Sequence, residues 1–234
     1  MAGRTLILLP PSEGKAPGGR GQPWRPGTLA LGDLDGARAE VLAVLGPEHP
    51  AVSGPTRRAI DRYTGVLYRK LDAPTLGTSA KRRLHRSTLI ASGLWGMVGP
   101  TDPIPDYRLK MSATVAPLGR LSTWWRRHLT AALGPRVAGA VVWDLLPREH
   151  AAALHWPALD PRRRITVRFL DHRGATVSHW NKLLKGSIVR WLVESGETDP
   201  ASLADLDHPP GYRFDAEASD LGRHRAEVVL REQP

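Results

Sequence analysis

The segment Ser12-Glu13-Gly14-Lys15 near the N-terminus contains residue types that are common in catalytic and phosphate-binding sites. It does not complete any of the motifs that it partly matches. Gly-Lys after an expected strand is typical of a phosphate-binding loop, yet Ala16 stands where that loop has a magnesium-binding Ser or Thr. Ser-x-Gly is typical of a nucleophile elbow, whose first glycine is here a proline. A Ser-x-x-Lys dyad needs a helical turn, which Gly14 opposes. The spacing alone favours a simple turn, placed where polar groups usually converge on a pocket.

A second candidate is the segment Asp106-Tyr107-Arg108-Leu109-Lys110, which has an acid, a phenol and two cations in proline-rich surroundings. In an extended segment Arg108 and Lys110 lie on one face and Tyr107 on the other. Arg108 suits a bidentate contact to phosphate. A surface ion pair on a turn explains the same residues equally well.

The third candidate is a helix expected between His179 and Glu194, with one apolar face. Its opposite face combines cations with a glycine, and a glycine there permits close approach by a ligand. A solvated basic face is the alternative interpretation. The residues of that face are Lys182, Lys185, Gly186 and Val189, with Arg190 at its edge.

The amino-acid composition limits the classes of molecule that the protein is expected to bind. Among 234 residues, 33 Lys and Arg against 23 Asp and Glu give a formal charge of +10, which indicates a polyanionic partner such as nucleic acid or a phosphorylated small molecule. The absence of cysteine excludes disulfides, Cys-ligated metals and thiol catalysis. No apolar run reaches the ~18 residues that span a bilayer. We expect a cytoplasmic protein with no membrane contact, no metal site and no cofactor.

The elements that must position these residues alternate between strands and helices. A turn at residues 171–174 leads into a return strand over 175–178, which predicts a hairpin. This order predicts a mixed α/β (α+β) fold with a mixed sheet rather than a doubly wound parallel sheet, in a single domain over 1–234 with a small helical subregion at 36–90. Strands are expected at 5–9, 138–146, 164–170 and 226–231, and helices at 36–45, 81–90, 122–133 and 181–194.

Several segments, in one order along the chain, resemble the YaaA family of bacterial proteins, which is associated with resistance to peroxide stress. The longest is SGLWGMVGPTDPIPDYRLKM, residues 92–111. The other segments are PSEGK at 11–15, Tyr63-Thr64-Gly65, the Trp124 region, the strand around Asp144, the basic positions between 182 and 190, and Gly211-Tyr212 with Phe214-Asp215.

The resemblance implies a mixed α/β fold with a helix-hairpin-helix-like part, a positively charged cleft, DNA binding, and a role in limiting iron-dependent oxidative damage. By position it places five residues in the cleft, namely Lys15, Arg108, Lys182, Lys185 and Arg190. The chain departs from the better-known form in its PSEGK loop, in Lys110 where an acid is common, and in a shortened region at 36–56.

Two functions remain open, and the sequence does not decide whether the protein is an enzyme. In the first, a nucleic-acid-binding stress protein holds phosphates with the basic residues above while Trp95 and Tyr107 stack on a base. In the second, an enzyme acts on a nucleotide-like or other phosphorylated small molecule. There Lys15 would be a nucleophile or phosphate clamp, with Ser12, Glu13 and Tyr63 transferring protons.

Overall fold

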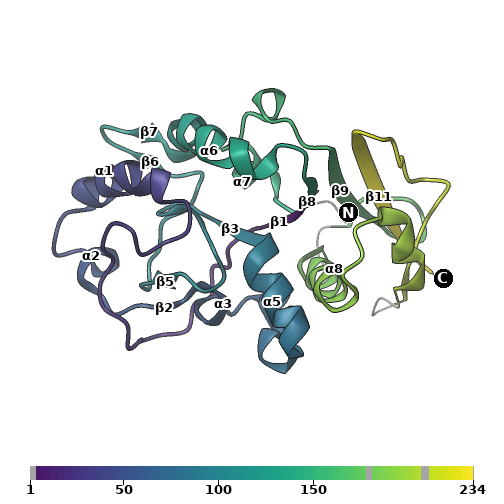
Figure 1. Ribbon diagram of the computed structural model, residues 1–234, viewed down its shortest axis with the longest axis horizontal. Coiled ribbons are helices and arrows are strands. Elements are labelled where there is room, and N and C mark those ends of the chain that lie inside the picture. Colours follow the sequence, from purple (N-terminus) through teal and green to yellow (C-terminus); the bar gives the residue numbers. More distant parts are fainter. Residues whose placement is uncertain (1–3, 178–180, 207–210, 234) are drawn as a thin grey trace.

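A seven-stranded sheet runs through the computed structural model, which describes residues 4–177, 181–206 and 211–233 (Figure 1). The strand order is β10-β11-β9-β8-β1-β3-β4. The five inner strands are parallel, and the edge strands β10 and β4 are antiparallel to their neighbours. The strands are β1 Thr5–Leu9, β3 Thr88–Ser92, β4 Gly96–Val98, β8 Val141–Asp144, β9 Arg163–Leu170, β10 Tyr212–Phe214 and β11 Arg225–Glu232.

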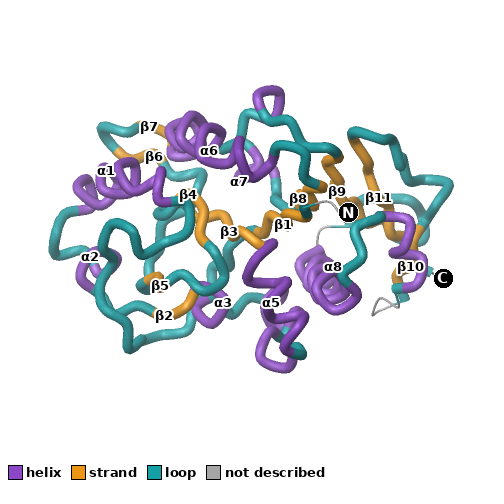
Figure 2. Tube along the Cα trace, in the orientation of Figure 1, coloured by secondary structure: helices purple, strands orange, loops and turns teal. Residues whose placement is uncertain are grey.

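Helices cover both faces of this sheet, with α6 and α7 on one side of the central strands and α5 and α8 on the other (Figures 1 and 2). None of the helices within the described ranges is long and apolar enough to cross a membrane. The helices are α1 Asp35–Leu45, α2 Pro50–Ser53, α3 Ala59–Arg62, α4 Val66–Leu71, α5 Thr78–Ser87, α6 Leu121–Val137, α7 Arg148–Ala151 and α8 Asn181–Ser195. Short 3-10 turns are η1 Gly32–Leu34, η2 Ala73–Thr75, η3 Trp156–Ala158 and η4 Pro200–Asp205.

Two small sheets lie outside the main one. Strand β2, Arg57–Arg58, pairs with β5, Pro103–Ile104, and β6, Thr114–Val115, pairs with β7, Gly119–Arg120. The β2–β5 pair joins the segment before α3 to the proline-rich segment after β4. These short pairings fix the path of two long irregular stretches that approach the carboxyl end of β1.

The mixed α/β class is confirmed, and the apolar runs form the expected buried strands. Strands β1 and β8 are buried along nearly their whole length, as is typical of inner strands with both faces covered. The inner sheet is nevertheless parallel, and the hairpin prediction is confirmed in part, since the Val177 N–H donates to the Phe169 carbonyl at 3.0 Å across the turn. Residues 171–174 do form the turn, but only one bridge, Leu170 to Thr176, follows it, and Ser178 lies outside the described residues. The returning segment lies beside β9 beyond the end of β8, and the opposite edge of β9 pairs with the parallel strand β11, which the chain reaches through α8.

Two helix ends differ from expectation. Helix α5 ends at Ser87, because Thr88, Leu89 and Ile90 belong to the fully buried strand β3. Helix α6 continues past Gly134 and Pro135 to Val137. A proline this close to the C-terminus removes one helical hydrogen bond, and the guanidinium of Arg4 caps the exposed carbonyls of Pro135 and Ala138 at 2.8 Å each.

Candidate anion-binding site

The candidate site lies at the carboxyl edge of the parallel sheet. Strands β1 and β8 are neighbours, but the chain leaves β1 toward β3 and leaves β8 toward β9, in opposite directions. Ligands of open α/β sheets bind in the crevice that such a switch creates at the carboxyl ends of the strands. The Ser12–Lys15 loop follows β1 at this edge, and Ser92 ends β3.

The Ser12–Lys15 loop is fixed by the segment at Tyr63-Thr64-Gly65. Lys15 and Tyr63 form an isolated antiparallel bridge, and the backbone N–H of Thr64 donates to the carbonyl of Gly14 and to Ser12 Oγ at 3.1 Å each. Ser12 Oγ in turn donates to the Gly14 carbonyl. A Cβ on Gly65 would lie 2.6 Å from Ser12 Cβ, so this contact requires glycine. The hydroxyl of Ser12 therefore holds the loop together.

Lys15 lies against the aromatic floor of the site. Its Nζ is 4.4 Å from the centre of the Tyr107 ring and 5.7 Å from that of Tyr63, and it donates to the Ser12 carbonyl at 3.1 Å. Burial lowers the pKa of Lys15, and the nearby Arg108 lowers it further, while Asp106 opposes both. The ammonium is thus partly desolvated and held by a cation–π contact.

A buried chain of hydroxyls fixes the aromatic floor from below. Tyr107 Oη lies 2.7 Å from Tyr63 Oη and 2.7 Å from Ser92 Oγ, and Ser92 Oγ accepts the backbone N–H of Trp95 at 2.9 Å. Burial raises the pKa of Tyr107 to about 12 and that of Tyr63 well above its usual value. Both phenols are therefore protonated at physiological pH, so Tyr63 can donate a hydrogen bond, but it is a weak acid and has no phenolate to act as a base.

The exposed carboxylate of Glu13 lies among several lysine side chains at the outer edge of the site. Lys110 Nζ pairs with Glu13 Oε1 at 3.2 Å, and both side chains are strongly exposed. The hydrogen bond and charge of Lys110 lower the pKa of Glu13, and the charges of Lys182 and Lys15 lower it further. The structure thus brings together residues from three separate sequence segments. We call Lys15, Arg108, Lys110 and Lys182 the cationic rim.

Most of the basic face expected on α8 is buried in the fold, including Lys185, Gly186 and Val189. A Cβ on Gly186 would lie 2.5 Å from the carbonyl oxygen of Leu67, so this glycine lets α8 pack closely on α4. Lys185 is 8% exposed and donates to the Leu145 carbonyl at 2.9 Å, just beyond β8. Burial lowers the pKa of Lys185 to about 8, with Asp144 opposing the shift. Only Lys182 of this set projects into solvent.

Arg190 has a structural role. Its guanidinium donates to the carbonyls of Leu71 and Asp72 at 3.1 and 3.3 Å and to Thr75 Oγ1 at 2.9 Å, and it pairs with Glu194 at 2.7 Å. These contacts cap the C-terminus of α4, where helix carbonyls lack partners. Its donors are directed at this helix end rather than at an open cleft.

The stacking prediction for Trp95 and Tyr107 is wrong for this structure, because both rings lie in the core. Trp95 is 0% exposed and Tyr107 is 4% exposed. Trp95 packs on Trp24, with 5.6 Å between ring centres, and Tyr107 forms the floor under Lys15. Neither ring offers a free face to a base.

Two buried arginines were missed by the sequence reasoning. Arg62 is 0% exposed and donates to the carbonyls of Ala16, Pro55 and Ile104, which ties the loop after Lys15 to the β2–β5 region. Arg38 is also fully buried; it pairs with Asp35 and reaches four carbonyls. Neither lies in an apolar pattern, so nothing in the sequence distinguishes them from solvated arginines.

Asp144 is likewise structural. Its Oδ2 accepts two hydrogen bonds from Arg164, and the Arg164 guanidinium stacks on Trp156 at 3.9 Å.

As for metals, the described part of the chain contains no group of three or more His, Asp or Glu side chains placed to hold an ion.

Comparison with known proteins identifies relatives along most of the chain. Residues 37–218 match the family model described as "Peroxide stress protein YaaA". A UPF0246 protein of Streptomyces coelicolor is 39% identical over 93% of this chain and 94% of its own length. A UPF0246 protein of Corynebacterium glutamicum is 34% identical over 81% of this chain and 85% of its own. One of Chromobacterium violaceum is 31% identical over 74% and 70%.

Proposed function

Because the chain belongs to the YaaA family of peroxide stress proteins, we propose that it acts in the response to peroxide by binding nucleic acid at the cationic rim. The observation that carries this proposal is the ion pair of Lys110 with the exposed carboxylate of Glu13 at 3.2 Å, where the charges of Lys182 and Lys15 also lower the pKa of Glu13. With Arg108, the rim has four cations against the two acids Glu13 and Asp106. A surplus of positive charge at the ligand-binding edge of a sheet favours an anion.

The rim is easily opened by a phosphate. Lys110 and Glu13 are 70% and 84% exposed, and an ion pair this exposed to water adds little to the stability of the fold. A phosphate oxygen can replace the Glu13 carboxylate at Lys110 with little loss of stability. Lys15, in contrast, is held by Tyr107 and the Ser12 carbonyl, and it supplies a fixed positive charge beneath the exposed ones.

The test compares fluorescent single-stranded, duplex and bulged DNA in binding assays at low salt. Lys110→Ala/Lys182→Ala is expected to weaken binding at least tenfold, because the protein then neutralises two fewer phosphates. Arg127→Ala/Arg136→Ala removes two exposed charges from α6 and is the matched control, expected to bind within twofold of wild type. Equal weakening by both variants would mean that only the overall charge matters, and the proposal would fail.

A second candidate, an enzyme acting on a nucleotide-like or other phosphorylated small molecule, is favoured by the surroundings of Lys15. A partly desolvated amine has a larger neutral fraction and is a better nucleophile. Next to it, Tyr63 and Tyr107 are protonated hydrogen-bond donors. Such a buried hydroxyl chain is more than phosphate binding requires.

The experiment for this candidate is a turnover screen of nucleotides and phosphorylated metabolites with wild type and Lys15→Met. Arg127→Ala/Arg136→Ala, which removes two exposed charges from α6 outside the rim, is the control. An activity abolished by Lys15→Met and retained by the control supports an enzyme. Absence of turnover with every compound, or equal loss in both variants, argues against it.

A further inference from the structure

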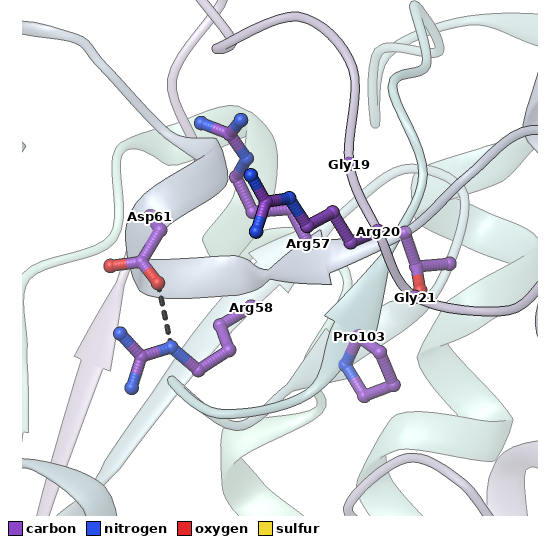
Figure 3. A pocket seen from close by; sticks show the side chains of 8 residues that line it. Gly19, Arg20, Gly21, Arg57, Arg58, Asp61 and Pro103 are labelled. Carbon is purple, nitrogen blue, oxygen red and sulfur yellow. Dashed lines mark hydrogen bonds and ion pairs between the residues drawn. The ribbon is translucent and has the colours of Figure 1, made fainter.

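A hollow of about 800 Å³ lies apart from the cationic rim and shares no lining residue with it. Its walls are the glycine-rich loop at residues 19–21, strand β2 with the start of α3, and Pro103 of β5 (Figure 3). Three arginines line it, Arg20, Arg57 and Arg58, together with one acid, Asp61. The proposed function assigns no role to these residues.

The fold builds this hollow by holding the glycine loop directly on β2. Gly21 and Thr56 exchange two backbone hydrogen bonds, each 3.0 Å long. A Cβ on Gly19 would lie 2.4 Å from the Thr56 carbonyl oxygen, and one on Gly21 would lie 2.2 Å from Thr56 Oγ1. The two glycines therefore allow the close approach, and Arg20 between them is carried to the mouth of the hollow.

The charges in the hollow do not balance. Arg58 pairs with Asp61 at 2.6 Å. Arg20 and Arg57 have neither an ion pair nor a side-chain hydrogen bond to any residue within the described ranges. Figure 3 shows both side chains pointing to the same side of the hollow. Two guanidiniums in one hollow repel each other unless an anion lies between them.

A further positive charge lies behind Arg57. Burial lowers the pKa of Arg62, the charge of Asp106 opposes this shift, and the charge of Arg57 lowers the pKa further, so Arg62 interacts electrostatically with both residues. Within the described residues Arg62 has hydrogen bonds only to carbonyls. The protein thus places a buried cation, which makes no ion pair within the described residues, within electrostatic reach of Arg57 and of Asp106.

We infer that this hollow binds the phosphate of a nucleotide or polynucleotide through Arg20 and Arg57. Guanidinium forks match phosphate oxygens in bidentate contacts. The unbalanced charge of +2 matches a phosphate monoester, which carries close to −2 at pH 7. The volume falls in the range of ~300–1,000 Å³ typical of small-molecule sites, so it also accommodates groups next to the phosphate.

The hollow and Lys15 lie at two ends of the same pair of segments. Lys15 bridges to Tyr63 and Gly21 bridges to Thr56, so residues 15–21 run antiparallel to residues 56–63. Six residue steps span at most ~22 Å. A short polynucleotide can reach both places, whereas a free nucleotide would occupy the hollow alone. The inference stands whether or not DNA binds at the rim.

The experiment measures binding of pyrophosphate, of ATP and of a ten-nucleotide single-stranded DNA by calorimetry at low salt. Arg57→Ala and Arg20→Ala are each expected to weaken phosphate binding at least tenfold. Arg25→Ala removes one exposed arginine from the same loop outside the hollow and is the matched control, expected to bind within twofold of wild type. Arg57→Lys keeps the charge but loses the fork, so it is expected to restore only part of the affinity.

The probes identify the source of the phosphate. Pyrophosphate and ATP binding that depends on Arg57 assigns the hollow to free nucleotides, and DNA binding alone with the same dependence assigns it to a polynucleotide. The inference is overturned if no probe binds at millimolar concentration, or if Arg25→Ala weakens binding as much as Arg57→Ala. Loss of DNA binding in Lys110→Ala/Lys182→Ala with pyrophosphate binding retained separates this site from the rim.

Discussion

The ammonium of Lys15 lies 4.4 Å from the centre of the Tyr107 ring, and the hydroxyl of that ring is bonded at 2.7 Å to both Tyr63 and Ser92. Residues from four separate segments therefore fix one cation at the carboxyl edge of the sheet. The hydroxyl chain orients the ring, and the ring with the Ser12 carbonyl holds the amine. This arrangement distinguishes Lys15 from the exposed lysines around it.

The hydroxyl chain predicts that removing two buried tyrosine hydroxyl groups, one at a time, lowers the stability of the protein by different amounts. Tyr107→Phe leaves both Tyr63 Oη and Ser92 Oγ without this partner, whereas Tyr68→Phe removes one bond, to the Pro10 carbonyl at 2.7 Å. A buried polar group without a partner costs ~1–3 kcal/mol, so Tyr107→Phe is expected to destabilise the protein by ~2 kcal/mol and Tyr68→Phe by ~1 kcal/mol. Urea unfolding measures both. Equal costs would show that the chain does not act as a unit.

The close packing of α4 and α8 predicts opposite effects of alanine at two helical glycines. In Gly186→Ala the new Cβ meets the Leu67 carbonyl and Lys70 Cβ at 2.5 and 2.8 Å, so the helices must separate. We expect a loss of ~2 kcal/mol in the free energy of unfolding. Gly36→Ala in α1 meets nothing within 4 Å, and it is expected to raise the free energy of unfolding by ~0.5 kcal/mol. Thermal unfolding of both variants tests this, and a neutral Gly186→Ala would contradict the packing argument.

The buried Lys185 predicts a stability that rises with pH in the alkaline range. Burial lowers its folded-state pKa to about 8 from 10.5, so between these values the unfolded state binds more protons and stability increases with pH. The free energy of unfolding of the wild type, measured relative to that of Lys185→Met, is expected to rise by ~2 kcal/mol between pH 7 and pH 9.5. Chemical denaturation of both proteins at several pH values measures this difference. A difference that does not change with pH would show that folding does not lower the pKa of Lys185.

The strands that carry the site were predictable because they are uniformly apolar. Residues 5–9 and the run ending at Asp144 are recognisable without any tertiary information, and so is the helix from Asn181. In the loop after β1, Lys15 bridges to Tyr63 and Ser12 Oγ accepts the N–H of Thr64, while the prediction of a pocket there stays a prediction. These features depend on local pattern and on the usual position of sites in α/β sheets.

The features that the sequence did not predict depend on contacts between segments that are far apart in the chain. The sequence around Gly186 is compatible both with a glycine beside a ligand and with a glycine at a helix–helix contact. Only the position of α4 in the fold shows that Gly186 lies at a helix–helix contact. Trp95 and Arg62 are buried although their neighbours in sequence give no such sign, because the segments that cover them come from elsewhere in the chain. The parallel pairing of β9 with β11 joins residues about 60 positions apart, and no local turn signals it.

The most direct test of nucleic-acid binding at the cationic rim is the salt dependence of DNA affinity. For a fluorescent duplex, the slope of log affinity against log salt falls by ~0.9 for each phosphate that the protein no longer neutralises. Lys110→Ala/Lys182→Ala is expected to reduce this slope by about 2, while Arg127→Ala/Arg136→Ala leaves it unchanged. A slope that is identical in wild type and both variants, or an affinity indifferent to salt, would contradict phosphate binding at the rim.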